Sequence, residues 1–128
     1  MDKTAPRPTD AELAILRVLW DRGPSTVREV HEALRNSQDS GYTTVLKLLQ
    51  IMTEKGLVDR DASQRAHVYV SRLGEHRTQR QLLRDLVDRA FGGSPGKLVL
   101  QALSSSKASP QEMKEIRRLL DQMEDKKA

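Results

Sequence analysis

The sequence predicts a mainly α-helical protein that also contains one small β-hairpin. Three observations favour this fold class. Apolar residues recur every three or four positions in six segments, the spacing that places them on one face of a helix. Between the third and the fourth of these segments the spacing changes to every second residue, which is typical of strands. Glycine, proline and helix-capping residues separate the segments.

The first helix is predicted to begin at Thr9, because the run Thr9-Asp10-Ala11-Glu12 matches a capping box. In that motif the threonine oxygen accepts an amide of the first turn and the glutamate reaches back to the cap. Gly23 permits a left-handed stop and Pro24 cannot continue a helix, so the helix is predicted to end near Arg22. Its apolar face contains Leu13, Leu16, Val18, Leu19 and Trp20.

The second and third helices are predicted to follow closely. Ser25 or Thr26 caps the second helix, which is predicted to stop in the polar run 36–41. The third helix extends from about Tyr42 to Lys55 and is closed by a glycine. The buried face of the second helix is predicted to contain Val27, Val30, Ala33 and Leu34.

The hairpin is predicted in the segment after Gly56. Alternation in residues 57–61 and 67–71 indicates two strands joined by a polar link at 62–66. The tip of this link, Ser63-Gln64-Arg65, lacks the Asn-Gly pair of a two-residue turn. We therefore expect a longer loop that projects from the protein.

Three more helices are predicted in the last part of the chain. The first begins at Leu73 and ends at Gly92-Gly93, and the second leads into a linker at 104–106. The third begins at Ser109-Pro110-Gln111-Glu112, which combines a capping serine, a proline at the first helical position and a glutamate at the third. The end of this helix is predicted to fray from Glu124. The predicted organisation is a first domain of residues 1–72 and a helical region of residues 73–128.

The composition limits the function. The chain of 128 residues contains no cysteine, which excludes disulfides, thiolate metal sites and a cysteine nucleophile. No apolar signal segment and no run of about 18 apolar residues is present, so we expect a cytoplasmic chain with no membrane insertion. The formal net charge of +4 modestly favours a polyanionic partner.

No arrangement of residues typical of an active site is found. The sequence has neither a Gly-rich phosphate loop nor a Ser-His-Asp arrangement that would identify a nucleophile. None of the three histidines, His31, His67 and His76, belongs to an HxxxH pair. His67 and His76 could bind a metal together with Glu75, but exposed positions on the protein surface are favoured for the histidines. The sequence therefore predicts no enzyme, no metal and no cofactor.

The third predicted helix has a polar face whose chemistry suits DNA. Three helices followed by a hairpin within about 70 residues is the order of a winged helix-turn-helix, in which the later helix lies in the major groove. Threonine can bond a base edge or a phosphate, glutamine can pair with adenine, and lysine can meet guanine or a phosphate. The candidate DNA-binding residues on this face are Thr43, Thr44, Lys47 and Gln50, and those on the hairpin, or wing, are Arg60 and Arg65, with His67 beside them.

Three alternatives stay open at this point. A helix with one apolar and one polar face is commonly a core helix whose other side is hydrated. The winged domain could also dock on another protein while the helical region assembles a complex without direct DNA binding. A third alternative is a sensor with a small-molecule pocket, although the sequence reveals no convergent polar groups for it.

The residues from Thr9 to Lys126 resemble the penicillinase and methicillin-resistance repressor family (BlaI and MecI), to which copper-responsive CopY-type repressors also belong. The resemblance rests on TDAELAILRVLWDRGPSTVREVHEAL and on GYTTVLKLLQIMTEKGLVDRD. It implies a homodimeric winged-helix repressor that binds an inverted-repeat operator of double-stranded DNA. It also implies a recognition role for the polar face of the third helix and a wing role for Arg65.

The resemblance further implies how the repressor is released. In penicillin-responsive relatives a membrane sensor protease cuts the helix that here reads KLVLQALSSS, and Gln101-Ala102 stands where those relatives carry an Asn-Phe pair. The paired cysteines of copper-sensing relatives are absent.

Dimerisation is also expected from the residues themselves. Hydrophobic residues make up 37% of the chain and aromatic residues 3%, which is lean for an independent monomer. Three short helices with about a dozen medium apolar side chains cannot form a generous closed core, so pairing with a second copy is favoured over packing on the winged domain. The candidate dimerisation residues are Leu82, Leu86, Phe91, Leu98, Leu103, Ile116, Leu120 and Met123.

Overall fold

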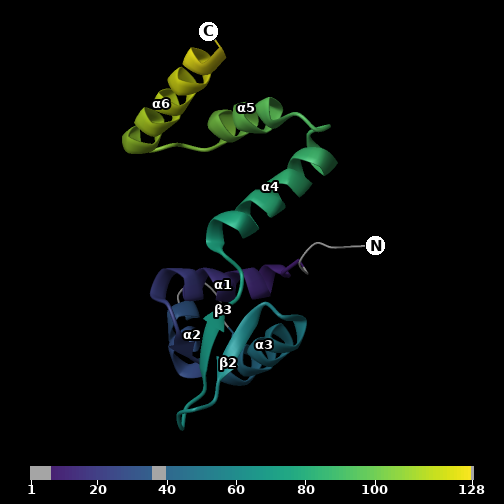
Figure 1. Cartoon of the computed structure of the whole chain (residues 1–128), viewed down its shortest axis with the longest axis vertical. Coiled ribbons are helices and arrows are strands. Elements are labelled where there is room, and N and C mark those ends of the chain that lie inside the picture. The colour runs from purple at the N-terminus through teal and green to yellow at the C-terminus, as the bar shows by residue number, and fades with distance from the viewer. Residues whose placement is uncertain (1–6, 36–39, 128) are drawn as a thin grey trace. The chain divides into compact units, whose positions relative to one another are not determined.

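The structure, a computed structural model, describes residues 7–35 and 40–127. Its elements, shown in Figure 1, are α1 (Asp10–Arg22), β1 (Ser25–Thr26), α2 (Val27–Leu34), α3 (Tyr42–Lys55), β2 (Val58–Asp61), β3 (Val68–Ser71), α4 (Glu75–Ala90), α5 (Pro95–Ser105) and α6 (Pro110–Lys127). The chain divides into two compact units, Met1–Gln81 and Leu82–Ala128, so that α4 begins in the first unit and ends in the second. No described helix is long and apolar enough to cross a membrane.

Capping boxes start α1 and α2, as the sequence predicts. The Thr9 amide donates to Glu12 Oε1 over 2.8 Å and the Glu12 amide donates to Thr9 Oγ1 over 3.2 Å. Thr26 and Glu29 form the same pair of bonds over 2.8 and 3.2 Å, which identifies Thr26 as the cap. Each box satisfies two groups that helix geometry leaves without partners.

The stop signals of these helices are confirmed in position but not in every detail. α1 ends at Arg22, but Gly23 has φ 89° and ψ −162°, which is not the left-handed helical conformation that we expected. The predicted end of α2 in the run 36–41 falls partly on residues 36–39, outside the described residues. α3 begins and ends where predicted, and Gly56 closes it in the left-handed conformation at φ 81°.

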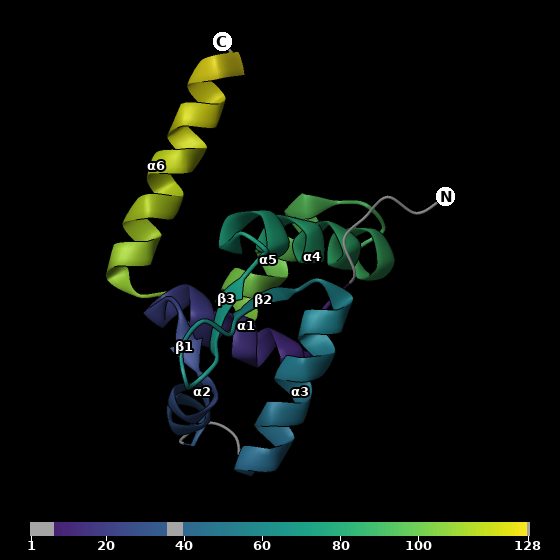
Figure 2. The same ribbon diagram turned by 60° about the horizontal axis from the view of Figure 1, so that its bottom comes forward.

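The sheet has three strands, one more than the sequence predicts. β3 lies between β1 and β2 and pairs with both in antiparallel register, with Ser25 opposite Tyr69 and Arg60 also opposite Tyr69. Figure 2 shows β1 beside β3 at the start of α2. β1 escapes prediction because its two residues are too short to show a period of two. The loop between β2 and β3 projects beyond the helices, as expected (Figure 1).

The hydrophobic core of the first unit is formed by one apolar face of each of α1, α2 and α3 together with the sheet. Partly buried side chains, among them Trp20, Leu46 and Leu73, pack against it. Its buried residues are Ile15, Leu16, Leu19, Val27, Val30, Leu34, Val45, Leu49, Met52, Leu57, Val58 and Tyr69. Burying each large aliphatic side chain stabilises the fold by about 1.5–3 kcal/mol, so these contacts fix where α3 lies.

The three helices after the sheet follow the predicted order, with two corrections to their bounds. α4 begins at Glu75 rather than Leu73, and it ends before Gly92 and Gly93, whose φ values are 58° and 82°. The predicted linker at 104–106 is wrong at its first two positions, because the hydroxyls of Ser104 and Ser105 donate to carbonyls four residues back and the helix continues through them. The tail from Glu124, which is predicted to fray, is helical through Lys127. The capping box at Ser109 is confirmed.

Candidate nucleic-acid interface

The four polar side chains predicted on the third helix all lie on the exposed face of α3. Thr43, Thr44, Lys47 and Gln50 are exposed, whereas Val45, Leu49 and Met52 on the other face are buried. The core holds α3 by that apolar face. Within the described part of the chain, no hydrogen bond or ion pair engages the four polar side chains, so their donors and acceptors are available to a ligand.

The first turn of α3 also offers backbone amides. Gly41 is the N-cap and provides no side-chain cap. The amides at the start of a helix lack intrahelical partners and carry the positive end of the helix dipole, which favours anions. The ring of Tyr42, the first residue of α3, meets the His31 ring of α2 edge to face, with centroids 6.0 Å apart. This contact fixes the start of α3 against α2.

A cavity of about 420 Å³ connects the starts of α2 and α3 with the hairpin loop. Three basic side chains line it: Arg28 from α2, and Arg65 and His67 from the loop. Its other lining residues are Thr26, Val27, Tyr42, Leu46, Ala66 and Tyr69, so no carboxylate is among them. A concave surface with basic groups and no acidic group suits a phosphate better than a cation or a neutral ligand.

The wing places its basic residues on one side of the hairpin. Arg60 is exposed and stands opposite Tyr69, and directly paired residues of antiparallel strands point to the same side. Because Tyr69 lines the cavity, Arg60 lies on the cavity side of the wing.

A hydrogen bond shapes the start of the hairpin loop, where Asp61 Oδ1 accepts the Ser63 amide over 2.9 Å. Hydrogen bonds from the Ser63 hydroxyl and amide hold the pKa of Asp61 below its ordinary value.

The structure thus brings together Arg65, His67 and a basic residue that the sequence reasoning missed. Arg28 lies in the first turn of α2 and lines the cavity. The sequence analysis considers only the apolar residues of that helix and so does not include Arg28. A signal was present, because Arg28 follows Val27 and precedes Val30, which puts it on the polar side of that helix. The interface therefore includes the start of α2 as well as α3 and the wing.

A partly buried ion pair holds the far end of α3. Lys55, the last residue of α3, donates to both carboxylate oxygens of Glu12 in α1 over 2.8 and 3.0 Å. Glu12 is only 2% exposed. Burial raises the pKa of Glu12, but hydrogen bonds from Lys55 and Thr9 outweigh burial and hold the pKa below its ordinary value. The charged pair therefore fixes the position of α3 relative to α1.

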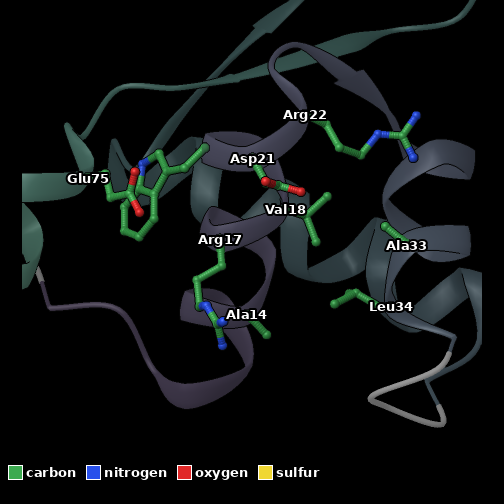
Figure 3. A pocket seen from close by; sticks show the side chains of 9 residues that line it. Ala14, Arg17, Val18, Asp21, Arg22, Ala33, Leu34 and Glu75 are labelled. Carbon is green, nitrogen blue, oxygen red and sulfur yellow. The ribbon is translucent and has the colours of Figure 1, made fainter. Parts of the chain in front are cut away.

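A second cavity of the first unit, about 580 Å³, has a different character (Figure 3). Its lining combines apolar residues of α1 and α2, including Val18 and Leu34, with both positive and negative side chains. Figure 3 shows Arg17, Asp21 and Arg22 projecting from α1 and Glu75 at one end. Because its charges are mixed, this cavity does not suit a polyanion.

No metal centre is formed in residues 7–35 and 40–127. No group of three or more His, Cys, Asp and Glu side chains in these ranges could hold a metal ion. The alternative that His67, Glu75 and His76 gather into such a group is therefore wrong.

The fold and this interface define a class of protein. Three helices, a three-stranded sheet with a projecting hairpin, and an exposed polar face on the third helix together form a winged helix-turn-helix, as the sequence predicts. The chain belongs to the penicillinase repressor family, whose sequence model matches residues 8–122. The family takes its name from repressors of penicillinase.

The relatives cover the chain to different extents. The chain is 48% identical over 61 residues to the transcriptional regulator BlaI of Mycobacterium tuberculosis, a match that spans 47% of this chain and only 44% of that protein. It is 23% identical over 125 residues to the penicillinase repressor of Bacillus licheniformis, which covers 98% of each chain. It is 21% identical over 121 residues to the methicillin resistance regulatory protein MecI of Staphylococcus aureus, which covers 94% of this chain and 98% of that protein.

Two solved structures resemble the first part of the chain. The solution structure of the DNA binding domain of the repressor BlaI covers 58% of this chain and 90% of its own, with a TM-score of 0.51 and 26% identity. The monomeric form of Bacillus licheniformis BlaI in complex with the blaP half-operator covers 56% of this chain and 88% of its own, with a TM-score of 0.50 and 25% identity. The predicted family and fold class are therefore confirmed.

Proposed function

We propose that this protein is a transcriptional repressor that binds an inverted-repeat operator as a homodimer. The observation that carries the proposal is the exposed face of α3, whose four polar side chains are held in place by a buried apolar face and engage no other described side chain. A BlaI relative of the same fold has been solved with a half-operator, which supports DNA as the ligand. Bound to a promoter, the dimer would repress transcription by occlusion.

The proposed contacts divide into those that read bases and those that position the protein. Lys47 and Gln50 lie on one face of α3 with Thr43 and Thr44, and this face enters the major groove. Each bidentate contact to a base discriminates by about 1–3 kcal/mol.

Basic residues around the 420 Å³ cavity are proposed to meet phosphates. Arg28 and Arg65 line the cavity and Arg60 lies on the same side of the wing. Contacts to phosphates fix orientation and carry no sequence information directly.

The second unit supports a dimer. Its helices leave many large apolar side chains exposed, whereas the buried core cluster belongs to the first unit. The exposed side chains are Leu83, Leu86, Val99, Leu100, Leu103, Leu119, Leu120 and Met123. Of the candidate dimerisation residues, Leu86, Leu103, Leu120 and Met123 are among them, while Leu82, Phe91, Leu98 and Ile116 are partly buried. A second copy would remove these side chains from water.

Release by a sensor protease is a further part of the proposal. Gln101 and Ala102 are exposed but lie inside α5, four and three residues before its end at Ser105. A protease binds an extended substrate, so cutting between them would require α5 to unwind locally. Mass spectrometry of the protein from cells treated with a β-lactam would test this step, and an intact chain under full induction would exclude it.

The test of DNA binding compares two double variants in fluorescence anisotropy with the upstream DNA of the protein's own gene. Lys47→Ala with Gln50→Ala is expected to weaken binding at least tenfold, since about 1–3 kcal/mol per contact is lost, and to lower the salt slope by about one if Lys47 meets a phosphate. The matched control is Gln111→Ala with Lys114→Ala, which removes the same two residue types three positions apart from exposed sites on α6.

The outcomes separate the two functions. Equal affinity of both double variants would refute the recognition role of α3. A protein-interaction module would show no salt-sensitive preference for a dyad in any of these proteins.

A further inference from the structure

The segment between β3 and α4 is held by hydrogen bonds at each of its three residues. The Arg72 amide donates to the Leu57 carbonyl over 3.0 Å, and the Leu73 amide donates to Ser71 Oγ over 3.2 Å. The Ser71 hydroxyl donates to the Leu73 carbonyl over 2.7 Å. The Gly74 carbonyl accepts the Thr78 amide over 3.0 Å, which begins α4. A segment this short that makes these four backbone hydrogen bonds has little freedom at the exit from the sheet.

Trp20 of α1 joins this network from a distant part of the sequence. Its indole Nε1 donates to the Leu73 carbonyl over 2.9 Å and to Ser71 Oγ over 3.2 Å. These contacts span more than fifty positions of sequence, and the Leu73 side chain packs partly against the core beside them. We call the indole of Trp20, the hydroxyl of Ser71 and the carbonyl of Leu73 the exit latch.

The first turns of α4 are packed into the same unit as the latch. Thr78 is buried, at 5% exposure, and the first unit extends to Gln81. Trp20 and Glu75, the first residue of α4, line the same 580 Å³ cavity, and Figure 3 shows Glu75 at its end. The latch therefore connects α1 to the start of α4.

We infer that Trp20 and Ser71 are positioning residues that make the repressor selective for the spacing between its two half-sites. The inference rests on the proposed function, because it requires a dimer bound to a dyad. The exposed apolar side chains proposed to dimerise follow the latch in sequence, so the start of α4 is the covalent link between the winged domain and the proposed dimer contacts. A latch that holds this link against α1 limits how far each winged domain can turn there, and a dimer limited in this way favours one separation of its half-sites.

DNA geometry turns this rigidity into selectivity. One inserted base pair lengthens the separation by about 3.4 Å and rotates one half-site by about 35° around the duplex. A protein with a rigid exit cannot follow that rotation without breaking contacts at one half-site. Loosening the exit lets each winged domain follow its own half-site.

The experiment uses the full-length protein and duplexes carrying the dyad that the wild-type protein selects from random DNA. The variants are Trp20→Phe, which keeps an aromatic ring but loses the indole donor, and Ser71→Ala, which loses the hydroxyl. Ser71→Thr is the matched control, because threonine keeps the hydroxyl and suits a strand. Affinity is measured for the dyad, for dyads with one or two inserted base pairs, and for a single half-site.

Both latch variants are expected to bind the single half-site as the wild type does. The affinity penalty for one inserted base pair is expected to fall by about three- to tenfold in them, the factor that corresponds to one lost hydrogen bond, and to stay unchanged in Ser71→Thr. Without DNA, the Leu73 amide is expected to exchange its hydrogen about tenfold faster in Ser71→Ala than in Ser71→Thr.

Three results would overturn the inference. An unchanged insertion penalty in both latch variants would show that the latch does not set spacing. An equal loss of affinity for the half-site and the dyad would assign the latch to folding alone. If the wild type selects no dyad, the proposed function fails and the spacing role with it, while the Leu73 exchange still reports separately whether the latch exists.

Discussion

Replacing Lys55 by methionine tests whether the partly buried ion pair with Glu12 holds α3 in place. The Glu12 side chain is 3% exposed and would keep only the Thr9 amide, so its charge would be left poorly compensated. Breaking a fully buried pair costs about 3–5 kcal/mol. Because the Lys55 side chain is 32% exposed, water screens part of this interaction, and we expect a loss of about 2 kcal/mol.

The loss is measured by thermal unfolding at a fixed protein concentration. For a unit of this size, 2 kcal/mol lowers Tm by about 8–16 °C. The control is Lys47→Met, the same change at an exposed position of the same helix, which is expected to alter stability by less than about 0.5 kcal/mol. Adding Glu12→Gln to Lys55→Met is expected to recover part of the loss, because a neutral amide costs less to bury than a charge.

The pH dependence follows from the lowered pKa of Glu12. Its ion pair contributes fully above the unfolded pKa of about 4.3, and the contribution is lost as the pH falls through the lower folded pKa. The stability gap between the wild type and Lys55→Met is therefore widest near neutral pH and narrows below about pH 4. A gap no larger than that of Lys47→Met, or one of equal size at pH 3 and pH 7, would refute this account.

Three other changes test separate parts of the structure. Arg28→Ala is expected to weaken operator binding similarly for all sequences and to reduce the salt slope by about one, measured by anisotropy; an unchanged slope would remove Arg28 from the phosphate contacts. Thr26→Ala is expected to cost about 1 kcal/mol in thermal unfolding, and Thr26→Ser much less, because serine keeps the capping oxygen. Leu120→Glu with Met123→Glu is expected to lower the mass measured by light scattering from that of a dimer to that of a single chain. A mass that stays at the dimer value would contradict the proposed interface.

Local signals in the sequence predicted most of the first unit. The capping boxes at Thr9 and Thr26 and the left-handed Gly56 act through neighbouring backbone groups, so a few adjacent residues determine them. β1 has no such signal, since its two residues become a strand only by pairing with β3. Ser104 and Ser105 misled the prediction because serine favours turns, yet here both hydroxyls bond carbonyls of their own helix.

The candidate interface was predictable in part for the same reason. Lys47 and Gln50 share a face because helix geometry alone puts residues three apart side by side. Arg28 joins Arg65 only because the hairpin folds back toward the start of α2, and no spacing in the sequence reveals that approach. The ion pair between Lys55 and Glu12 joins residues 43 positions apart, and the sequence does not predict it either. Each residue alone is typical of a helix end, so neither indicates a partner.

α1 contributes no side chain to the proposed DNA surface, yet it holds polar contacts near both of its ends. Glu12 fixes the end of α3 through Lys55, and Trp20 fixes the start of α4 through Leu73. Substitutions at the exposed tips of α3 can therefore change which bases are read while the scaffold stays intact. Substitutions at Glu12 or Trp20 act on where α3 lies or on how the half-sites are spaced. Base preference and operator spacing should consequently respond to different residues, and variants of the two groups should combine with additive effects on affinity because the side chains share no partner.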